Sequence, residues 1–123
     1  MDVNKSELVP PRGVEDIRSV KSVYVGTFGA TEAAFLVQEK LTNRLSTRSG
    51  LAVATSIEDA DSLLTGFVGT TVSGFANASF FRLLGKAGKI LWAGEYGTGI
   101  WGSASSHVAD KVADDIVKAV NKK

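Results

Sequence analysis

The chain contains no cysteine, one histidine, two prolines and no long apolar run. Without cysteine there can be no disulfides, thiolate nucleophiles, cysteine-bound zinc or iron–sulfur clusters. The single histidine, His107, excludes a metal site built on two histidines. No segment approaches the roughly 20 apolar residues that a membrane-spanning helix needs. The first residues also lack the basic start and apolar core of a signal peptide. We therefore expect a soluble chain that does not insert into a membrane.

An excess of charge of one sign is also missing. The 123 residues include 14 Lys and Arg against 13 Asp and Glu, which gives a net charge of +1. Such a balance provides no long-range field to attract phosphates, so nucleic acid is not an expected partner. The length is typical of one domain that can bury its own core.

The N-terminal segment, residues 1–19, carries Pro10, Pro11, Gly13 and alternating charges without an apolar period. This composition predicts a flexible leader or tether. Residues 20–123 are expected to form a single domain.

That domain is predicted to begin with a strand, a helix and a second strand. Residues 20–28 are rich in β-branched and aromatic side chains and end at Gly29, which predicts an internal strand. Thr31 is suited to cap the helix that follows. The helix has apolar residues at helical spacing: Ala34, Val37, Leu41 and Leu45. Residues 51–55 form the second strand, which a right-handed crossover places parallel to the first.

Three more strands, about 62–72, 78–84 and 89–98, follow with short turns between them and predict an antiparallel meander. Gly66 is expected to mark a bulge or a close approach under the helices. On the last of these strands we expect three apolar side chains to share the core face, with Lys89 and Glu95 on the other: Ile90, Trp92 and Tyr96.

A second helix, about 103–120, closes the chain. Its apolar stripe consists of Ala109, Val112, Ala113, Ile116 and Val120. The predicted class is α+β, a two-layer sandwich with a five-stranded mixed sheet and two helices on one face. The predicted element order is β-α-β-β-β-β-α.

Three segments carry a resemblance to a bacterial family. Ala60-Asp61 leads into Leu63-Leu64-Thr65-Gly66, and Ser79-Phe80-Phe81-Arg82-Leu83 and Gly88-Lys89-Ile90-Leu91-Trp92 follow. Over about residues 20–120 the chain resembles the CsgG-like and TolB amino-terminal group of envelope domains, and uncharacterised secreted bacterial proteins. The resemblance implies a periplasmic or secreted accessory domain that contacts other envelope proteins. It supplies no catalytic residue, and the acylatable cysteine of the lipoprotein members is missing here.

The loop 97–102 spells G-x-G-x-x-G between a strand and a helix, where backbone amides can bind a phosphate. The context differs from that of a dinucleotide fold because the helix ends the chain and no strand carries the ribose-binding acid. We expect no cofactor. The glycines are better explained as residues that let the chain bend where the strand turns into the helix. A weaker alternative is an anion site at the start of the last helix, formed by Gly99, Gly102, Ser105, Ser106 and His107.

Two sets of polar residues resemble catalytic or metal-binding sites but have simpler structural explanations. Ser103, His107 and Asp110 can share one helix face, but a triad on a regular helix has no strained elbow and no oxyanion hole. Asp59 and Asp61 could bind calcium or act as acid and base, yet no oxygen-rich run surrounds them. Turn chemistry accounts for both carboxylates. We expect no enzymatic activity.

Aromatic residues recur through the meander, and most are expected in the core. Phe80 and Phe81 are consecutive, so on a regular strand one of them must face away from the helices. With Trp101 in the glycine-rich loop, this pair is the predicted partner surface.

Two functions remain open at this point. One is a noncatalytic interaction domain that docks another envelope protein or a second copy of itself through its sheet. The other is a small anion- or nucleotide-binding domain that uses the loop Gly97–Gly102 and the start of the last helix.

Overall fold

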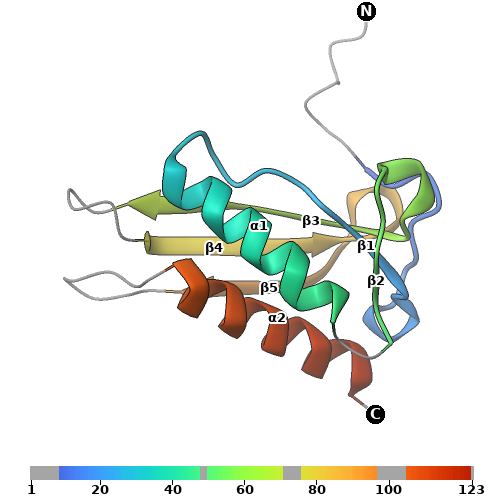
Figure 1. Ribbon diagram of the computed structural model, residues 1–123. Coiled ribbons are helices and arrows are strands. Elements are labelled where there is room, and N and C mark those ends of the chain that lie inside the picture. Colours follow the sequence, from blue (N-terminus) through green and yellow to red (C-terminus); the bar gives the residue numbers. More distant parts are fainter. Residues whose placement is uncertain (1–8, 48–49, 71–75, 97–104, 123) are drawn as a thin grey trace, which may run out of the picture.

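The computed structural model describes residues 9–47, 50–70, 76–96 and 105–122 (Figure 1). These ranges form a five-stranded mixed sheet and two α-helices, which confirms the predicted α+β class and element order. The elements are η1 (Ile17–Ser19), β1 (Ser22–Val25), α1 (Glu32–Ser46), β2 (Ala52–Val53), η2 (Ile57–Asp59), β3 (Ser62–Thr70), β4 (Ala76–Leu84), η3 (Lys86–Gly88), β5 (Ile90–Tyr96) and α2 (Ser105–Asn121), where η denotes a short 3-10 helix.

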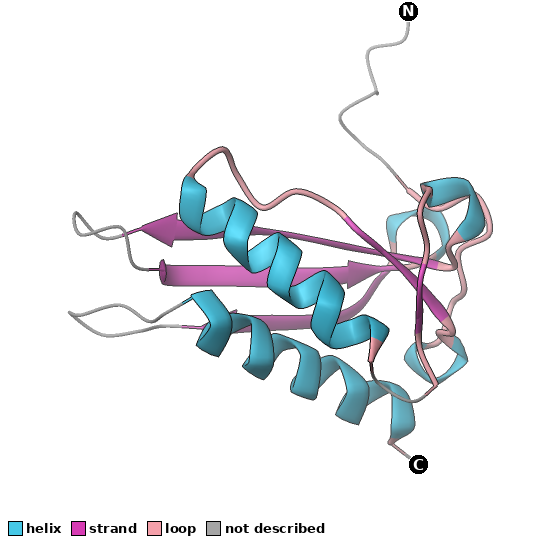
Figure 2. Ribbon diagram, in the orientation of Figure 1, coloured by secondary structure: helices cyan, strands magenta, loops and turns pink. Residues whose placement is uncertain are grey.

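The sheet has the strand order β2-β1-β3-β4-β5. β1 pairs with β2 in parallel, as the crossover predicted, and it also pairs in parallel with β3. β3, β4 and β5 form the predicted antiparallel meander. The parallel strands are short, so the long β3 and β4 supply most of the sheet surface (Figure 2).

Both helices lie side by side on one face of the sheet (Figure 1). Thr31 caps α1, and its hydroxyl oxygen accepts a hydrogen bond from the Ala34 N–H at 3.1 Å. The predicted apolar stripes of both helices are buried. Arg44 of α1 donates through Nε to Asp110 of α2, which ties the two helices together at the edge of their contact.

Phe81 is at the centre of the core and fills space that two glycines leave. On β4 it pairs with Gly66 of β3 on one side and Gly94 of β5 on the other. A Cβ at Gly66 would lie 2.3 Å from the Phe80 carbonyl oxygen and 2.9 Å from the Phe81 ring. Gly66 therefore marks a close approach between strands, one of its two predicted roles, and the bulge of this strand pair lies between Phe67 and Gly69.

Residues 10–20 pack against the domain, which differs from the flexible segment expected over 1–19. The Val14 N–H donates to the Asp61 carbonyl at 3.1 Å, and the Lys86 N–H donates to the Val14 carbonyl at 2.8 Å. A Cβ at Gly13 would lie 2.5 Å from the Lys86 nitrogen, so the backbone there is in close contact with η3. The packed domain thus begins well before residue 20, because Gly13 permits this approach.

A bulge on β5 changes the face on which Ile90 lies. Leu83 pairs with Trp92 but Leu84 pairs with Ile90, which leaves Leu91 as an extra residue. Trp92 and Tyr96 pack against the core as predicted, whereas Ile90 is 54% exposed. The prediction that Ile90 shares their face was wrong because it assumed an uninterrupted strand.

Candidate functional site

The face of the sheet opposite the helices carries an aromatic pair. Phe67 of β3 and Phe80 of β4 are cross-strand partners, and their rings stack with centroids 6.1 Å apart and planes at 30°. Phe67 is 48% exposed and Phe80 is 38% exposed. Large apolar side chains placed together in solvent are typical of a contact surface.

Two opposite charges flank this pair on the same face. Arg82 follows Phe80 by two residues on β4, and its guanidinium carbon lies 5.4 Å from the centre of the Phe80 ring. Glu95 of β5 is the cross-strand partner of Phe80, and Ala93 is the partner of Arg82. Within the described ranges, no ion pair joins Arg82 or Glu95 to another residue of the chain.

We call the set Phe67, Phe80, Arg82, Ile90 and Glu95 the open-face patch. Its members come from the three strands of the meander, and all five are exposed. Alternation along each strand brings them together, and the bulge at Leu91 adds Ile90 to this face. The sequence pointed to Phe80 and placed Glu95 on the face away from the core, but it did not single out Phe67 or Arg82 for the partner surface, and it assigned Ile90 to the core. The available signal was spacing, because Arg82 lies two positions from Phe80 and so shares its face.

The predicted partner surface is corrected at Phe81. Its side chain has 0% exposure and contacts Phe28 edge-on, with ring centroids 5.0 Å apart. The prediction that one of the two phenylalanines faces away from the helices is confirmed, and that residue is Phe80. Phe81 faces the helices because Gly66 and Gly94 beside it leave room for its ring. Trp101 lies outside the described residues.

The predicted anion site falls largely outside the described ranges. Gly99 and Gly102 lie in the part of the loop that is not described, while Ser105 and Ser106 are the first two residues of α2. His107 is exposed in the first turn of that helix. Asp110, the acid of the triad that we considered, binds Arg44 across the helix pair.

Asp61 and Asp59 have structural roles. The Asp61 carboxylate accepts hydrogen bonds from the Lys21 N–H at 2.8 Å and the Ser22 N–H at 3.2 Å, so it ties the start of β1 to the turn before β3. Asp59 accepts from the Ser56 hydroxyl at 3.1 Å. The Asp61 carboxylate therefore organises the backbone of a neighbouring strand instead of its own turn, and Asp59 contacts a side chain, so the predicted bonding of each carboxylate to its own turn is not what the structure shows. No cluster of metal-binding side chains is found in the described part of the chain.

Tyr96 joins β5 to the last helix. Its hydroxyl donates a 2.7 Å hydrogen bond to Oδ2 of Asp115 on α2. Burial, the hydrogen bond and the negative charge of Asp115 raise the pKa of Tyr96 well above its ordinary value of 10.0. The pair faces the core side of the sheet, so it stabilises the packing of α2 and is not part of the open-face patch.

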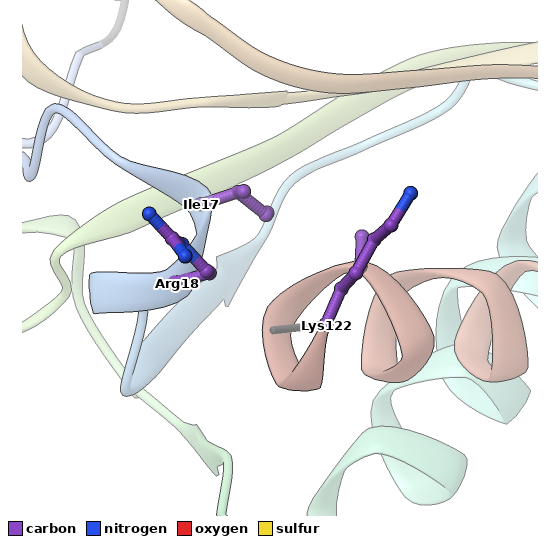
Figure 3. A pocket seen from close by; sticks show the side chains of 4 residues that line it. Ile17, Arg18 and Lys122 are labelled. Carbon is purple, nitrogen blue, oxygen red and sulfur yellow. The ribbon is translucent and has the colours of Figure 1, made fainter.

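An open hollow of about 210 Å³ lies between η1 and the end of α2, lined by Ile17, Arg18, Ala119 and Lys122. Figure 3 shows Ile17 and Arg18 on one wall and Lys122 on the other. Arg18 is paired with Asp16 at 3.5 Å, and both side chains are more than half exposed. Its two polar lining side chains, Arg18 and Lys122, are both cations, and among the described residues no carboxylate, histidine or hydroxyl side chain lines it beside them.

Neither helix within the described ranges has the length and apolar character required to cross a bilayer. A scan against protein-family models and a comparison with curated proteins find no match to this chain.

Solved structures share the fold. A candidate lipoprotein from Caulobacter crescentus CB15 superposes with a TM-score of 0.56 at 18% identity, over 87% of this chain and 97% of that one. A point variant of the PelC dodecamer from Paraburkholderia phytofirmans gives 0.53 at 19% identity, over 90% and 95%. Lipoprotein GNA1162 from Neisseria meningitidis gives 0.47 at 17% identity, over 83% and 98%. The first two likenesses show that this chain shares its fold with bacterial proteins.

Proposed function

We propose that this chain is a noncatalytic protein-interaction domain of the bacterial envelope that docks other proteins, or a second copy of itself, through the open-face patch. The observation that carries the proposal is the stacked Phe67–Phe80 pair, held in solvent on a sheet face that no described helix covers. Burying apolar area of this kind against a partner is favourable by about 25 cal/mol per Å².

The envelope location, periplasmic or secreted, is supported by the candidate lipoprotein that shares the fold. It is also supported by the resemblance to CsgG-like and TolB amino-terminal domains noted from the sequence. The dodecameric state named for PelC supports self-association as one use of this fold. Within this proposal the chain needs no cofactor, does not act on nucleic acid and does not itself enter the membrane.

Site-specific photo-crosslinking in the bacterium that encodes the chain tests the proposal. A photoreactive amino acid replaces Phe80 on the open-face patch, and a matched variant carries it at Lys111, which is exposed on α2. We expect protein adducts from position 80 in the envelope fraction and few or none from position 111. Absence of any adduct at position 80, or equal adducts at both positions, contradicts the proposal.

Titration with phosphate and nucleotides examines the alternative of an anion site. Under the interaction proposal, the amide chemical shifts of His107 and its neighbours at the start of α2 stay fixed. Saturable shifts there would instead favour ligand binding by the last loop and helix.

A further inference from the structure

We propose that the occupant of the open-face patch is a second copy of this chain, docked face to face about a two-fold axis that places Arg82 against Glu95 of the second copy. This inference rests on the proposed interaction function and names its partner. It follows from the arrangement of charges around the aromatic pair and from the size of the face.

The charges make the patch complementary to itself. A two-fold interface uses the same surface on both copies, so each positive group must meet a negative group of that same surface. The open-face patch carries one cation and one anion, Arg82 and Glu95, and within the described residues neither is paired inside the chain. A partner that carried only one sign of charge would leave one of them unmatched.

The register places these two charges correctly. Phe80 pairs with Glu95 and Arg82 pairs with Ala93, so the four residues form the corners of a cross-strand rectangle of about 4.8 by 6.8 Å, with the charges on one diagonal. A two-fold axis lying between the two faces, along the other diagonal, passes over Phe80 and Ala93. Rotation about this axis brings the Arg82 position to within about 3 Å of the Glu95 position of the second copy in projection, and the reverse, a gap that both long side chains can span.

The aromatic residues then form the centre of the interface. Phe80 lies on the axis and packs against Phe80 of the second copy, while Phe67 and Ile90 cover the sides. Residues that contribute most of the binding energy usually lie near the centre of an interface, surrounded by contacts that exclude water. The cation–π contact between Arg82 and Phe80 already holds the guanidinium beside the axis.

The size of the face predicts a weak dimer. β3, β4 and β5 are nine, nine and seven residues long. With strands about 4.8 Å apart and about 3.4 Å per residue, the face presents roughly 400 Å² in projection. That area is about half of the roughly 800 Å² per partner that specific, stable complexes bury, and it falls in the range of weak, transient contacts. We therefore expect a dissociation constant in the micromolar range.

Charge reversal tests the predicted pairing. Sedimentation across protein concentration compares the wild type with Arg82→Glu, Glu95→Arg and the double reversal. Each single change creates two like-charge contacts, one for each half of the dimer, and we expect it to weaken dimerisation at least about 10-fold. The double reversal restores opposite pairs and should return the constant to near the wild-type value. Lys111→Glu, on the exposed side of α2, is the control and should leave it unchanged.

The absence of cysteine permits a second, independent test. Ala93→Cys places the only thiol of the chain on the predicted axis, and Lys111→Cys places it on the helix side. A short bis-maleimide should link two copies of the first variant and not of the second. Any of three results would overturn the inference. The wild type could be monomeric at all concentrations, the single charge reversals could dimerise as tightly as the wild type, or the double reversal could fail to restore dimerisation. If the wild type is monomeric but position 80 still crosslinks to a different protein in cells, the interaction function stands and only the second-copy partner fails.

Discussion

The two faces of this sheet use the same residue type for different purposes. Phe81 and Phe80 are neighbours on β4, yet Phe81 is completely buried and Phe80 is 38% exposed. Phe81 contacts Phe28 and Tyr96 beneath the helices, whereas Phe80 contacts Phe67 and Arg82 in solvent. The helix-covered face therefore holds the fold together, and the open face is available for a partner. This difference can be measured, since changes on the two faces should affect different quantities.

Phe81→Ala is expected to have the largest effect. Removing a fully buried phenylalanine costs the lost burial and leaves a cavity, together about 3–5 kcal/mol of unfolding free energy. Phe80→Ala is the matched control and should cost less than about 1 kcal/mol, as surface changes do. Urea denaturation at low protein concentration measures both, and Phe81→Leu provides a milder variant if Phe81→Ala does not fold. Equal losses at positions 80 and 81 would contradict the division between the two faces.

Gly66→Ala is expected to come next, with a loss of about 2–3 kcal/mol, as in other overpacked cores. The new methyl group would meet the Phe80 carbonyl oxygen at 2.3 Å, and a backbone atom cannot move aside without disturbing the β3–β4 pairing. Gly94→Ala, on the other side of Phe81, is the comparison. There the atoms nearest to the methyl group, at 2.8 Å, would be at the ends of the Trp92 and Tyr96 side chains. Thermal unfolding should rank Gly94→Ala as the milder change, and the reverse order would argue against this account of Gly66.

The residues that distinguish the two sheet faces were predictable from the sequence only in part. The strand, helix and strand at the start were predictable from their apolar periods, and the later meander was predictable from the short turns between its strands. The consecutive pair Phe80-Phe81 required one ring to face outward, but only the register against Gly66 and Gly94 decides which one. No local signal marks Leu91 as an extra residue, so Ile90 was assigned to the wrong face. The packing of Gly13 against Lys86 joins residues far apart in the chain, and no period in the sequence reports such a contact.

Tyr96→Phe tests the contact between β5 and α2 on the helix-covered face. It should lower the free energy of unfolding by about 1–2 kcal/mol, because it removes a hydrogen bond to a charged group. The pKa of Tyr96 is raised in the folded state, so its contribution to stability is fully present below the unfolded value of 10.0 and is lost as the pH rises above it. The stability difference between wild type and Tyr96→Phe should therefore shrink from pH 8 to pH 11. Urea denaturation at each pH measures it. A constant difference over that range would mean that the Asp115 contact does not depend on the protonated hydroxyl.

The smallest expected effect is the coupling between Phe67 and Phe80 on the open face. In a double-mutant cycle with alanine, a stacked aromatic pair contributes about 0.5–1.5 kcal/mol beyond the area it buries. Measured on the dilute monomer, the coupling should lie at the low end of that range, since Phe67 and Phe80 remain 48% and 38% exposed to solvent. Repeated at high protein concentration, the same cycle should give a larger value, because the second copy buries both rings and removes them from competing water. A coupling that does not change with protein concentration would mean that self-association does not bury the aromatic pair. The exposure of Phe67 and Phe80 would then have to be explained by a different partner.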